Sequence, residues 1–252
     1  INSKFGKASG TVVIEEFLSG IELSVFIITD GNNYVILPEA KDYKRIGEKD
    51  TGLNTGGMGS ISPVPFANQT FMQKVEDKII KPTVKGLKNN NIDYCGFIFF
   101  GLINCNGEPY VIEYNCRMGD PETESVFPRI NNDIIEVFKA AANKTLDTIT
   151  IDIKKETAAT VMLVAEGYPE KYPKGMNISF DDINENDIIF HAGTALDNDN
   201  NVVTSGGRVI TATALGNNLE DALQKAYLLA EKINFDHKYF RKDIGFDLID
   251  LK

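Results

Sequence analysis

The sequence predicts an α+β fold, with antiparallel sheets and flanking helices, followed by a smaller α+β domain. Runs rich in β-branched and aromatic residues succeed one another across short turns such as Asn106-Gly107, which is typical of antiparallel strands. Apolar residues recur at helical spacing between such runs, most clearly over residues 219–233. The pattern changes after the polar segment 144–155, which indicates a domain boundary near residue 154.

The elements of the first part follow from these patterns. Residues 38–65 are rich in glycine and lack periodicity, which predicts a long loop that is either functional or disordered. Pro82 is expected to break or kink the helix that contains it. The predicted strands are residues 11–17, 22–29, 33–37, 96–103 and 110–117, and the predicted helices are 71–87, 122–129 and 134–142.

The second part is predicted in less detail. Residues 158–165, 188–191 and 208–213 have the composition of strands, and residues 219–233 form an amphipathic helix. No internal repeat or low-complexity tract interrupts either part.

Composition restricts the classes of partner. The 252 residues carry a formal net charge of −10 and no block of Lys or Arg, so nucleic acid and anionic membranes are poor partners. A small anionic substrate can still be held by a few local cations. The longest apolar stretch, residues 96–103, is too short to cross a bilayer. Three cysteines without a disulfide or CxxC pattern indicate reduced thiols and a cytoplasmic location.

The strongest chemical signal is the predicted strand that contains Glu113, Asn115 and Arg117. Alternate residues of a strand share a face, so these three side chains should point one way while Tyr114 and its alternate neighbours point the other. Two hard oxygen ligands and a guanidinium suit a Mg²⁺–polyphosphate complex. The alternative is an ordinary solvated strand face.

The residues that follow extend this signal. Pro121 stands at the expected first position of a helix, which places Asp120 near its N-cap. An ordinary helix cap explains this segment alone. Beside a polar strand face, however, a helix N-terminus is a natural anion site.

A second signal is the segment from Asp42 to Gly59. It contains five glycines between positions 47 and 59 and the basic pair Lys44-Arg45. Glycine lets backbone N–H groups approach an anion closely, so the segment favours phosphate binding. It contains neither a Walker A motif nor a Rossmann fingerprint, and a flexible connecting loop is the alternative.

Together the motifs resemble one family. Glu-Glu-Phe-Leu with Gly-x-Glu, Asp-x-Lys-Arg, Asn-Thr-Gly-Gly-Met-Gly and Glu-x-Asn-Cys-Arg-x-Gly-Asp-Pro-Glu occur in this order in glycinamide ribonucleotide synthetases, which have the ATP-grasp fold. The second part adds segments 190–194, 205–209 and 241–245, which are also similar to that family. Single motifs are loose, but the ordered set is specific and spans nearly the whole chain.

The resemblance implies a function and a set of site residues. The family joins glycine to 5-phosphoribosylamine through glycyl phosphate, with ATP as phosphoryl donor and Mg²⁺ or Mn²⁺ as metal. The residues matched to ATP binding are Glu15, Glu16, Phe17, Leu18, Glu22 and Lys44, and those matched to the metal are Glu113 and Asn115. Arg117 and Asp42 match catalytic positions, and Arg45, Gly56, Gly57, Asp120 and Glu122 match substrate-binding positions.

The resemblance also implies that a family enzyme has more than this chain. The sequence opens at Ile1 and not at Met, which we interpret as a truncation that removes an N-terminal domain and the front of a lid. We therefore expect residues 1–14 to be a lid remnant with a loosely held start, 15–154 the ATP-grasp core and 155–252 the C-terminal domain. Glycine-dependent ADP release is not expected from the chain alone.

Two alternatives to this interpretation stay open on sequence. One is another ATP-grasp ligase, such as a carboxylase that acts on a purine intermediate. The other is a nucleotide-binding or scaffolding module without catalysis. We expect Glu113→Gln to impair nucleotide engagement more than Tyr114→Phe, and Gly57→Val to harm catalysis while thermal stability stays nearly intact.

Overall fold

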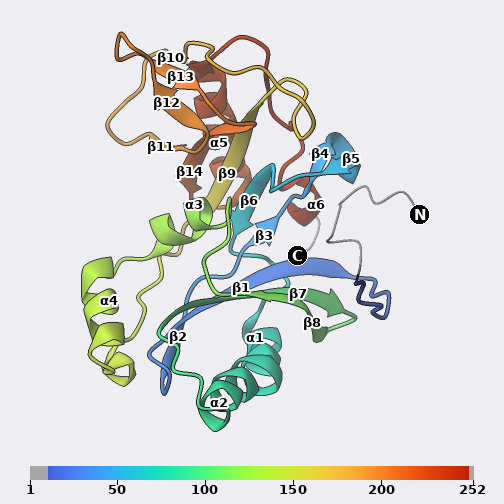
Figure 1. Cartoon of the computed structure of the whole chain (residues 1–252), viewed down its shortest axis with the longest axis vertical. Coiled ribbons are helices and arrows are strands. Elements are labelled where there is room, and N and C mark those ends of the chain that lie inside the picture. Colours follow the sequence, from blue (N-terminus) through green and yellow to red (C-terminus); the bar gives the residue numbers. More distant parts are fainter. Residues whose placement is uncertain (1–10, 250–252) are drawn as a thin grey trace.

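Two antiparallel sheets form the frame of the protein in the computed structural model, which describes residues 11–249 (Figure 1). The first sheet has the strand order β2-β1-β7-β8, and the second has the order β11-β14-β9-β6-β3 with β16 also paired to β9. The strands of the first sheet are β1 (Ile21–Thr29), β2 (Tyr34–Ile36), β7 (Gly96–Cys105) and β8 (Glu108–Asn115). Those of the second are β3 (Lys41–Asp42), β6 (Gly59–Ser62), β9 (Thr157–Ala165), β11 (Ile188–His191), β14 (Arg208–Gly216) and β16 (Lys238–Tyr239).

The first sheet is covered on both faces because β1 and β7 are apolar on both. Val25 and Phe100 lie in one hydrophobic cluster with residues of α1 (Gln69–Val75) and α2 (Lys81–Asn89), which lie below the sheet in Figure 1. Phe26 and Phe99 lie in a second cluster with residues of α4 (Ile134–Ala142). The two faces are thereby fixed, and so is the direction of every polar side chain on the same strands.

The predicted helix over 71–87 is confirmed, with a modification near Pro82. The Asn68 side chain accepts a hydrogen bond from the backbone N–H of Phe71 and begins α1. A wider helical turn over Glu76–Ile80 connects α1 to α2, and Pro82 stands in the first turn of α2. Proline is tolerated there because the first N–H groups of a helix have no partner within it. The chain therefore stays helical through the proline.

Two predictions were wrong. The expected loop 38–65 contains β3, β4 (Arg45–Gly47), a 3₁₀ turn (Glu48–Asp50), β5 (Thr51–Asn54) and β6. Strands this short show no measurable periodicity in the sequence. β6 is also paired with β9, which lies about a hundred residues further along the chain, so its strand form cannot be predicted locally. Conversely, residues 11–20 contain no strand, and Ile14 and Phe17 are each 93% exposed. Their composition favours a strand, but no strand of residues 11–249 pairs with them.

The second sheet joins residues from both sides of the predicted boundary at 154. In the pairing of β6 with β9, Gly59 is opposite Val161 and Ile61 is opposite Ala159. The predicted strands β9, β11 and β14 and the helix α5 (Leu219–Lys232), which packs on this sheet, are confirmed. The division into 15–154 and 155–252 stays a prediction, with a sheet that crosses it.

The remaining elements are short. None of the helices in residues 11–249 has the length and apolar character that crossing a membrane requires. The remaining short helices and turns are α3 (Thr123–Val126), α6 (Phe246–Ile249) and the 3₁₀ turns Phe127–Arg129 and Leu146–Thr148. The remaining short strands form two pairs, β10 (Ser179–Phe180) with β15 (Ile233–Asn234) and β12 (Thr194–Leu196) with β13 (Val202–Thr204).

Candidate functional site

One end of the first sheet carries polar side chains on the face that elsewhere holds Phe26. Ser24 of β1 is opposite Gly101 of β7, and Gly101 is in turn opposite Glu113 of β8. A methyl group on residue 101 would lie 2.8 Å from Cγ of Glu113, so glycine there leaves the space that Glu113 occupies. The Asn115 side-chain amide donates to Oε1 of Glu113 at 3.1 Å. The predicted shared face of Glu113 and Asn115 is therefore confirmed.

Tyr114 lies on the opposite face, as predicted. Its ring centroid is 5.5 Å from that of Phe100, and its hydroxyl lies 3.4 Å from Oγ1 of Thr83 in α2. Arg117, in contrast, does not belong to the face, because β8 ends at Asn115 and the alternation ends with it. Its guanidinium donates to the backbone carbonyl of Met118 at 2.8 Å. The prediction of a three-residue face that includes Arg117 is wrong.

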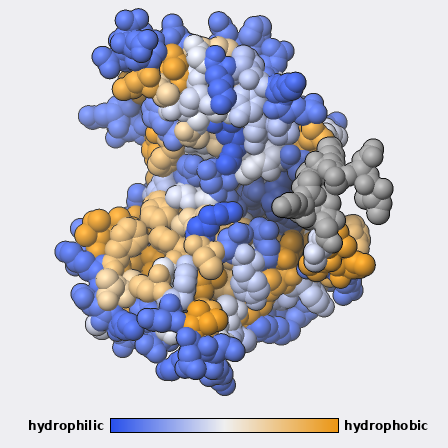
Figure 2. Space-filling view, in the orientation of Figure 1, coloured by the Kyte–Doolittle hydropathy of each residue, from blue (hydrophilic) through white to orange (hydrophobic). Residues whose placement is uncertain are grey.

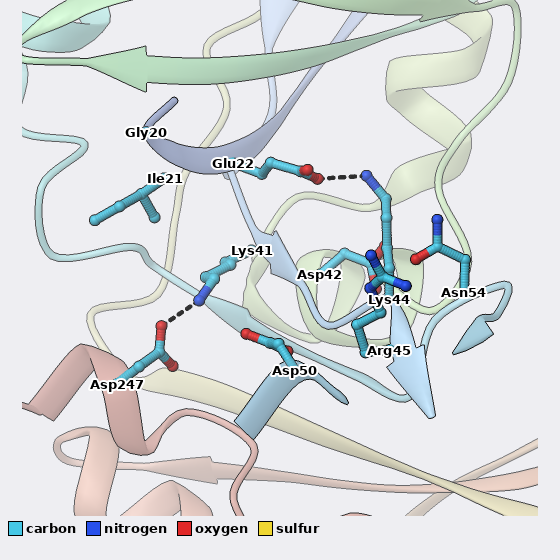
Figure 3. Close-up of a pocket in the computed structure, with 10 residues that line it drawn as sticks. All are labelled: Gly20, Ile21, Glu22, Lys41, Asp42, Lys44, Arg45, Asp50, Asn54 and Asp247. Carbon is cyan, nitrogen blue, oxygen red and sulfur yellow. Dashed lines mark hydrogen bonds and ion pairs between the residues drawn. The ribbon is translucent and has the colours of Figure 1, made fainter. Parts of the chain in front are cut away.

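Asp42, the last residue of β3, and Lys44, just before β4, approach this face. Nζ of Lys44 lies 2.5 Å from Oε2 of Glu22 (Figure 3). Burial alone would lower the pKa of Lys44. The hydrogen bond and the negative charge of Glu22 outweigh burial, so the pKa of Lys44 is raised. Glu22, Asp42, Lys44 and Glu113 line one recess together. Three segments far apart in sequence thus converge.

The Asp42 carboxylate is unusual. Its Oδ1 atom is enclosed and has no hydrogen-bond partner among the described residues. Burial raises the pKa of Asp42 well above its usual value; the negative charges of Glu122 and Glu22 act in the same direction and Lys44 opposes them. An enclosed carboxylate oxygen without a donor is an unmet acceptor, which a proton on the carboxyl group would satisfy.

A cavity of about 450 Å³ adjoins this recess (Figure 3). Arg45 and Asn54 line it beside Glu22 and Lys44, and the Arg45 guanidinium also donates to the carbonyl of Gly52 at 2.9 Å. Figure 2 shows the surface hollowed between the upper and lower parts of the molecule, with hydrophilic side chains gathered in the hollow. The predicted substrate residue Arg45 therefore lies beside the predicted ATP residues.

The turn after β8 closes the recess. Glu122 is only 4% exposed, and Ser24 donates to its Oε1 at 2.7 Å. Burial raises the pKa of Glu122, although the hydrogen bond from Ser24 opposes this. The predicted anion site at a helix N-terminus is not formed: α3 has four residues and begins at Thr123, not Pro121, and the Asp120 carboxylate pairs with Arg208 at 3.0 Å.

Gly56 and Gly57 have protein partners for their amides. The N–H of Gly56 donates to the Tyr168 hydroxyl at 3.0 Å, and that of Gly57 donates to Oγ1 of Thr55 at 2.9 Å. Gly57 has φ +121° and packs against Asp42 and Pro121. The structure thus gives Gly57 a packing role that the sequence did not indicate, while a direct role in phosphate binding stays a prediction.

Arg208 of β14 is a residue that sequence reasoning missed. One guanidinium nitrogen, Nη1, donates at 2.8 Å to the carbonyl oxygens of both Gly56 and Asp120, in addition to its pair with the Asp120 carboxylate. A methyl group on residue 56 would lie 2.8 Å from the guanidinium carbon. Arg208 therefore ties two predicted substrate-binding segments together. Its motif, 205–209, was part of the family resemblance, but spacing alone did not indicate these contacts.

The predicted adenine segment lies at the outer edge of the same sheet. Glu15, Glu16, Phe17 and Leu18 line a groove of about 380 Å³ with Glu22 and with residues of β7 and β8. The groove contains Ile103, Tyr110 and Ile112, which offer apolar surface for a flat ring. The segment is thus placed beside Glu22, as its predicted role requires.

The fit to a divalent cation depends on few ligands. Within residues 11–249 no group of three or more His, Cys, Asp or Glu side chains is arranged to hold a metal ion. Glu113 and Asn115 nevertheless supply two hard oxygens on one face, and Mg²⁺ that is bound with a polyphosphate commonly takes only one or two protein ligands. The residues present fit a cation carried in by a nucleotide.

Glu124 of α3 gives the site a pH-dependent contribution to stability. Burial, reinforced by the charge of Asp120, raises the pKa of Glu124 to about 7, and Arg208 opposes this. Between the pKa of the unfolded chain and pH 7, folded Glu124 keeps a proton that the unfolded chain loses. The contribution of Glu124 to the free energy of unfolding therefore falls as pH rises, by at most about 3 kcal/mol at pH 8.

Glu124→Gln should remove this fall. Urea denaturation at pH 5 and pH 8 is expected to show a smaller difference in unfolding free energy for Glu124→Gln than for the unmodified chain. Glu136→Gln, on exposed α4 surface, is the matched control and should keep the original difference. Equal pH differences for all three proteins would contradict the buried state of Glu124.

Comparison with known proteins identifies the fold and the family. The phosphoribosylglycinamide synthetase ATP-grasp (A) domain matches residues 1–123, and the C domain of the same synthetase matches residues 158–247. The fold is therefore that of an ATP-grasp protein, as the sequence predicted. More particularly, the chain belongs to the phosphoribosylglycinamide synthetase family, which confirms the resemblance and decides against another ATP-grasp ligase.

Individual relatives agree with this. The phosphoribosylamine–glycine ligase of Fusobacterium nucleatum is 46% identical over 248 residues, which are 97% of this chain and 58% of that protein. The crystal structure of phosphoribosylamine–glycine ligase from Thermotoga maritima superposes with a TM-score of 0.82 at 37% identity, covering 91% of this chain and 56% of that one. This chain thus spans just over half the length of these two relatives.

A more distant structure shares the fold alone. The biotin carboxylase domain of Hydrogenobacter thermophilus 2-oxoglutarate carboxylase, solved with MgADP and bicarbonate, has a TM-score of 0.60 at 13% identity. The match covers 87% of this chain and 46% of that one.

Proposed function

We propose that this chain supplies the nucleotide and metal site of an ATP-dependent ligase that joins glycine to 5-phosphoribosylamine, giving glycinamide ribonucleotide, ADP and phosphate. The observation that carries the proposal is the convergence of Glu22, Asp42, Lys44 and Glu113 around one recess from three separate segments. Membership of the phosphoribosylglycinamide synthetase family supports the choice of substrates. We also propose a cytoplasmic location, which the free cysteines support.

The proposed roles are those of the matching family positions, and the positions of the residues in the structure support them. Glu15 to Leu18 and Glu22 bind the adenosine part of ATP. Glu113 and Asn115 hold Mg²⁺ or Mn²⁺, which when bound neutralises charge on the transferring phosphoryl group. Lys44 adds a fixed positive charge beside Glu22.

The remaining residues serve the acceptors. Asp42 has an enclosed free oxygen and a raised pKa, so it can accept the proton that the attacking amine loses. Arg117 is exposed beyond the end of β8, and by its match to the family we assign it to neutralise phosphoryl charge. Substrate binding is assigned to Arg45, Gly56, Gly57, Asp120 and Glu122. The proposed core 15–154 carries these residues, and Arg208 of the proposed C-terminal domain 155–252 donates hydrogen bonds to two of them, Gly56 and Asp120.

A hybrid enzyme tests this function. The 248 matched residues of the Fusobacterium nucleatum ligase are replaced by this chain, and ADP formation is measured with freshly generated 5-phosphoribosylamine. We expect ADP formation that requires both glycine and the amine. ADP formation at the same rate with and without glycine would contradict the proposal. A folded hybrid that binds ATP but forms no ADP would favour the alternative of a non-catalytic nucleotide-binding module.

A further inference from the structure

The segment from Lys41 to Lys44 has two sides with different partners. Lys41 and Tyr43 are buried and bind α6, whereas Lys44 pairs with Glu22 and Asp42 lines the recess beside it. Lys41 and its α6 partner Asp247 also line the neighbouring cavity of about 450 Å³ (Figure 3). The alternation of partners along the segment is that expected of an extended chain. Whatever fixes the buried side therefore also sets the direction of the two site residues.

Backbone pairing with β6 holds the chain at residues 41 and 42, and a single carboxylate binds both buried side chains. Oδ2 of Asp247 in α6 forms an ion pair with Nζ of Lys41, and Oδ1 of Asp247 accepts a hydrogen bond from the Tyr43 hydroxyl at 2.6 Å (Figure 3 shows the first). Nζ of Lys41 lies 4.3 Å from the Tyr43 ring centroid, and the Arg241 guanidinium carbon lies 5.4 Å from it. Asp247 therefore supplies the counter-charge of Lys41 and the partner of the buried Tyr43 hydroxyl, while Arg241 pairs with Asp50 and Asp243.

We propose that Asp247 is a positioning residue that holds residues 41–44 so that Asp42 and Lys44 face the nucleotide site. The proposal rests on the proposed function for its effect on ATP, but not for its effect on Lys44. Without Asp247, the Tyr43 hydroxyl and the Lys41 ammonium lose their partner in a buried place, where an unpaired polar group is costly. Both then turn toward water, and the opposite side of the segment turns with them.

The test compares Asp247→Ala with Asp221→Ala. Asp221 of α5 also pairs with a lysine, Lys225 at 2.9 Å, but lies away from the recess. Two readouts at a temperature well below unfolding separate positioning from stability. One is the rate at which acetic anhydride labels Lys44, measured by mass spectrometry with Lys139 of α4, which no variant in the test contacts, as internal reference. The other is the dissociation constant for Mg·ATP.

We expect Asp247→Ala to raise the Lys44 labelling rate several-fold, because its amine leaves Glu22, and to weaken Mg·ATP binding by about tenfold. Asp221→Ala should change neither. In a Lys44→Met background, Asp247→Ala should weaken binding much less, since it acts mainly through that residue. Asp247→Asn, which still accepts from Tyr43, should be intermediate.

The outcomes are distinct. A lower melting temperature with unchanged Lys44 labelling and unchanged Mg·ATP affinity would overturn the proposal and leave Asp247 a purely structural residue. If the unmodified chain binds no Mg·ATP, the proposed function fails, while the labelling rate of Lys44 still decides the positioning role.

Discussion

Glu113→Gln should weaken binding of Mg·ATP to this chain by roughly 10- to 100-fold, the range seen when a metal site loses an orienting or ligating group. Glutamine has nearly the same shape, so Gly101 still leaves it space, but it lacks the charge that holds a divalent cation. Stability should hardly change because Glu113 is exposed. Isothermal titration with Mg·ATP at constant pH measures the loss.

Tyr114→Phe is the matched control on the neighbouring residue. Its hydroxyl faces Thr83 on the other side of the sheet and its ring stays packed on Phe100, so affinity for Mg·ATP should be unchanged. Equal losses for the two variants would show that the two faces of β8 do not differ in function, and the assignment of Glu113 to the metal would fall.

Gly57→Ala should lower both stability and nucleotide affinity. The added methyl group would lie 2.3 Å from Cδ of Pro121 and 2.7 Å from Oδ1 of Asp42, and φ of +121° is strained for any L side chain. Overpacking and strain together should reduce the free energy of unfolding by about 3 kcal/mol. The affinity falls because Asp42 must move. Thermal denaturation and Mg·ATP titration measure the two effects.

The packing around Gly57 replaces the expectation from sequence that valine at position 57 leaves thermal stability nearly intact. Gly175→Ala separates the two causes, since Gly175 also has a positive φ, +81°, but no neighbour within 4 Å of the added methyl group. It should cost about 1 kcal/mol from strain alone and leave Mg·ATP binding unchanged. If both variants lose the same stability, the contact of Gly57 with Pro121 and Asp42 has no energetic weight.

The elements predicted well are those whose sequence period is long enough to detect. β1, β7, β8 and α5 each span at least eight residues and are confirmed nearly to their ends. The strands between residues 41 and 62 have two to four residues, too few to show a period. β4 and β5 pair with each other, but β6 pairs with the distant β9, which local patterns do not reveal. Residues 11–17 show the converse, because β propensity without a pairing strand does not make a strand.

The candidate site was predictable where order along the chain carried information. The ordered motifs named Glu22, Asp42, Lys44 and Glu113, which line one recess in the structure, while their roles stay a prediction. Arg117 was misplaced because the strand ends two residues before it. Arg208 and Asp247 were missed for a different reason, because their partners are distant in sequence. β14 brings Arg208 against Gly56 and Asp120, and α6 brings Asp247 against residues 41–43. Their contacts leave no spacing pattern in the sequence.

Hydrogen–deuterium exchange with and without Mg·ATP tests the location of the nucleotide most directly. The account predicts slower exchange in residues 15–24, 41–45 and 111–117 when Mg·ATP is bound, and loss of that protection in Glu113→Gln at the same nucleotide concentration. Protection confined to residues 179–204 of the C-terminal part would contradict it. So would protection at the first sheet that is the same with and without Mg²⁺ and in Glu113→Gln.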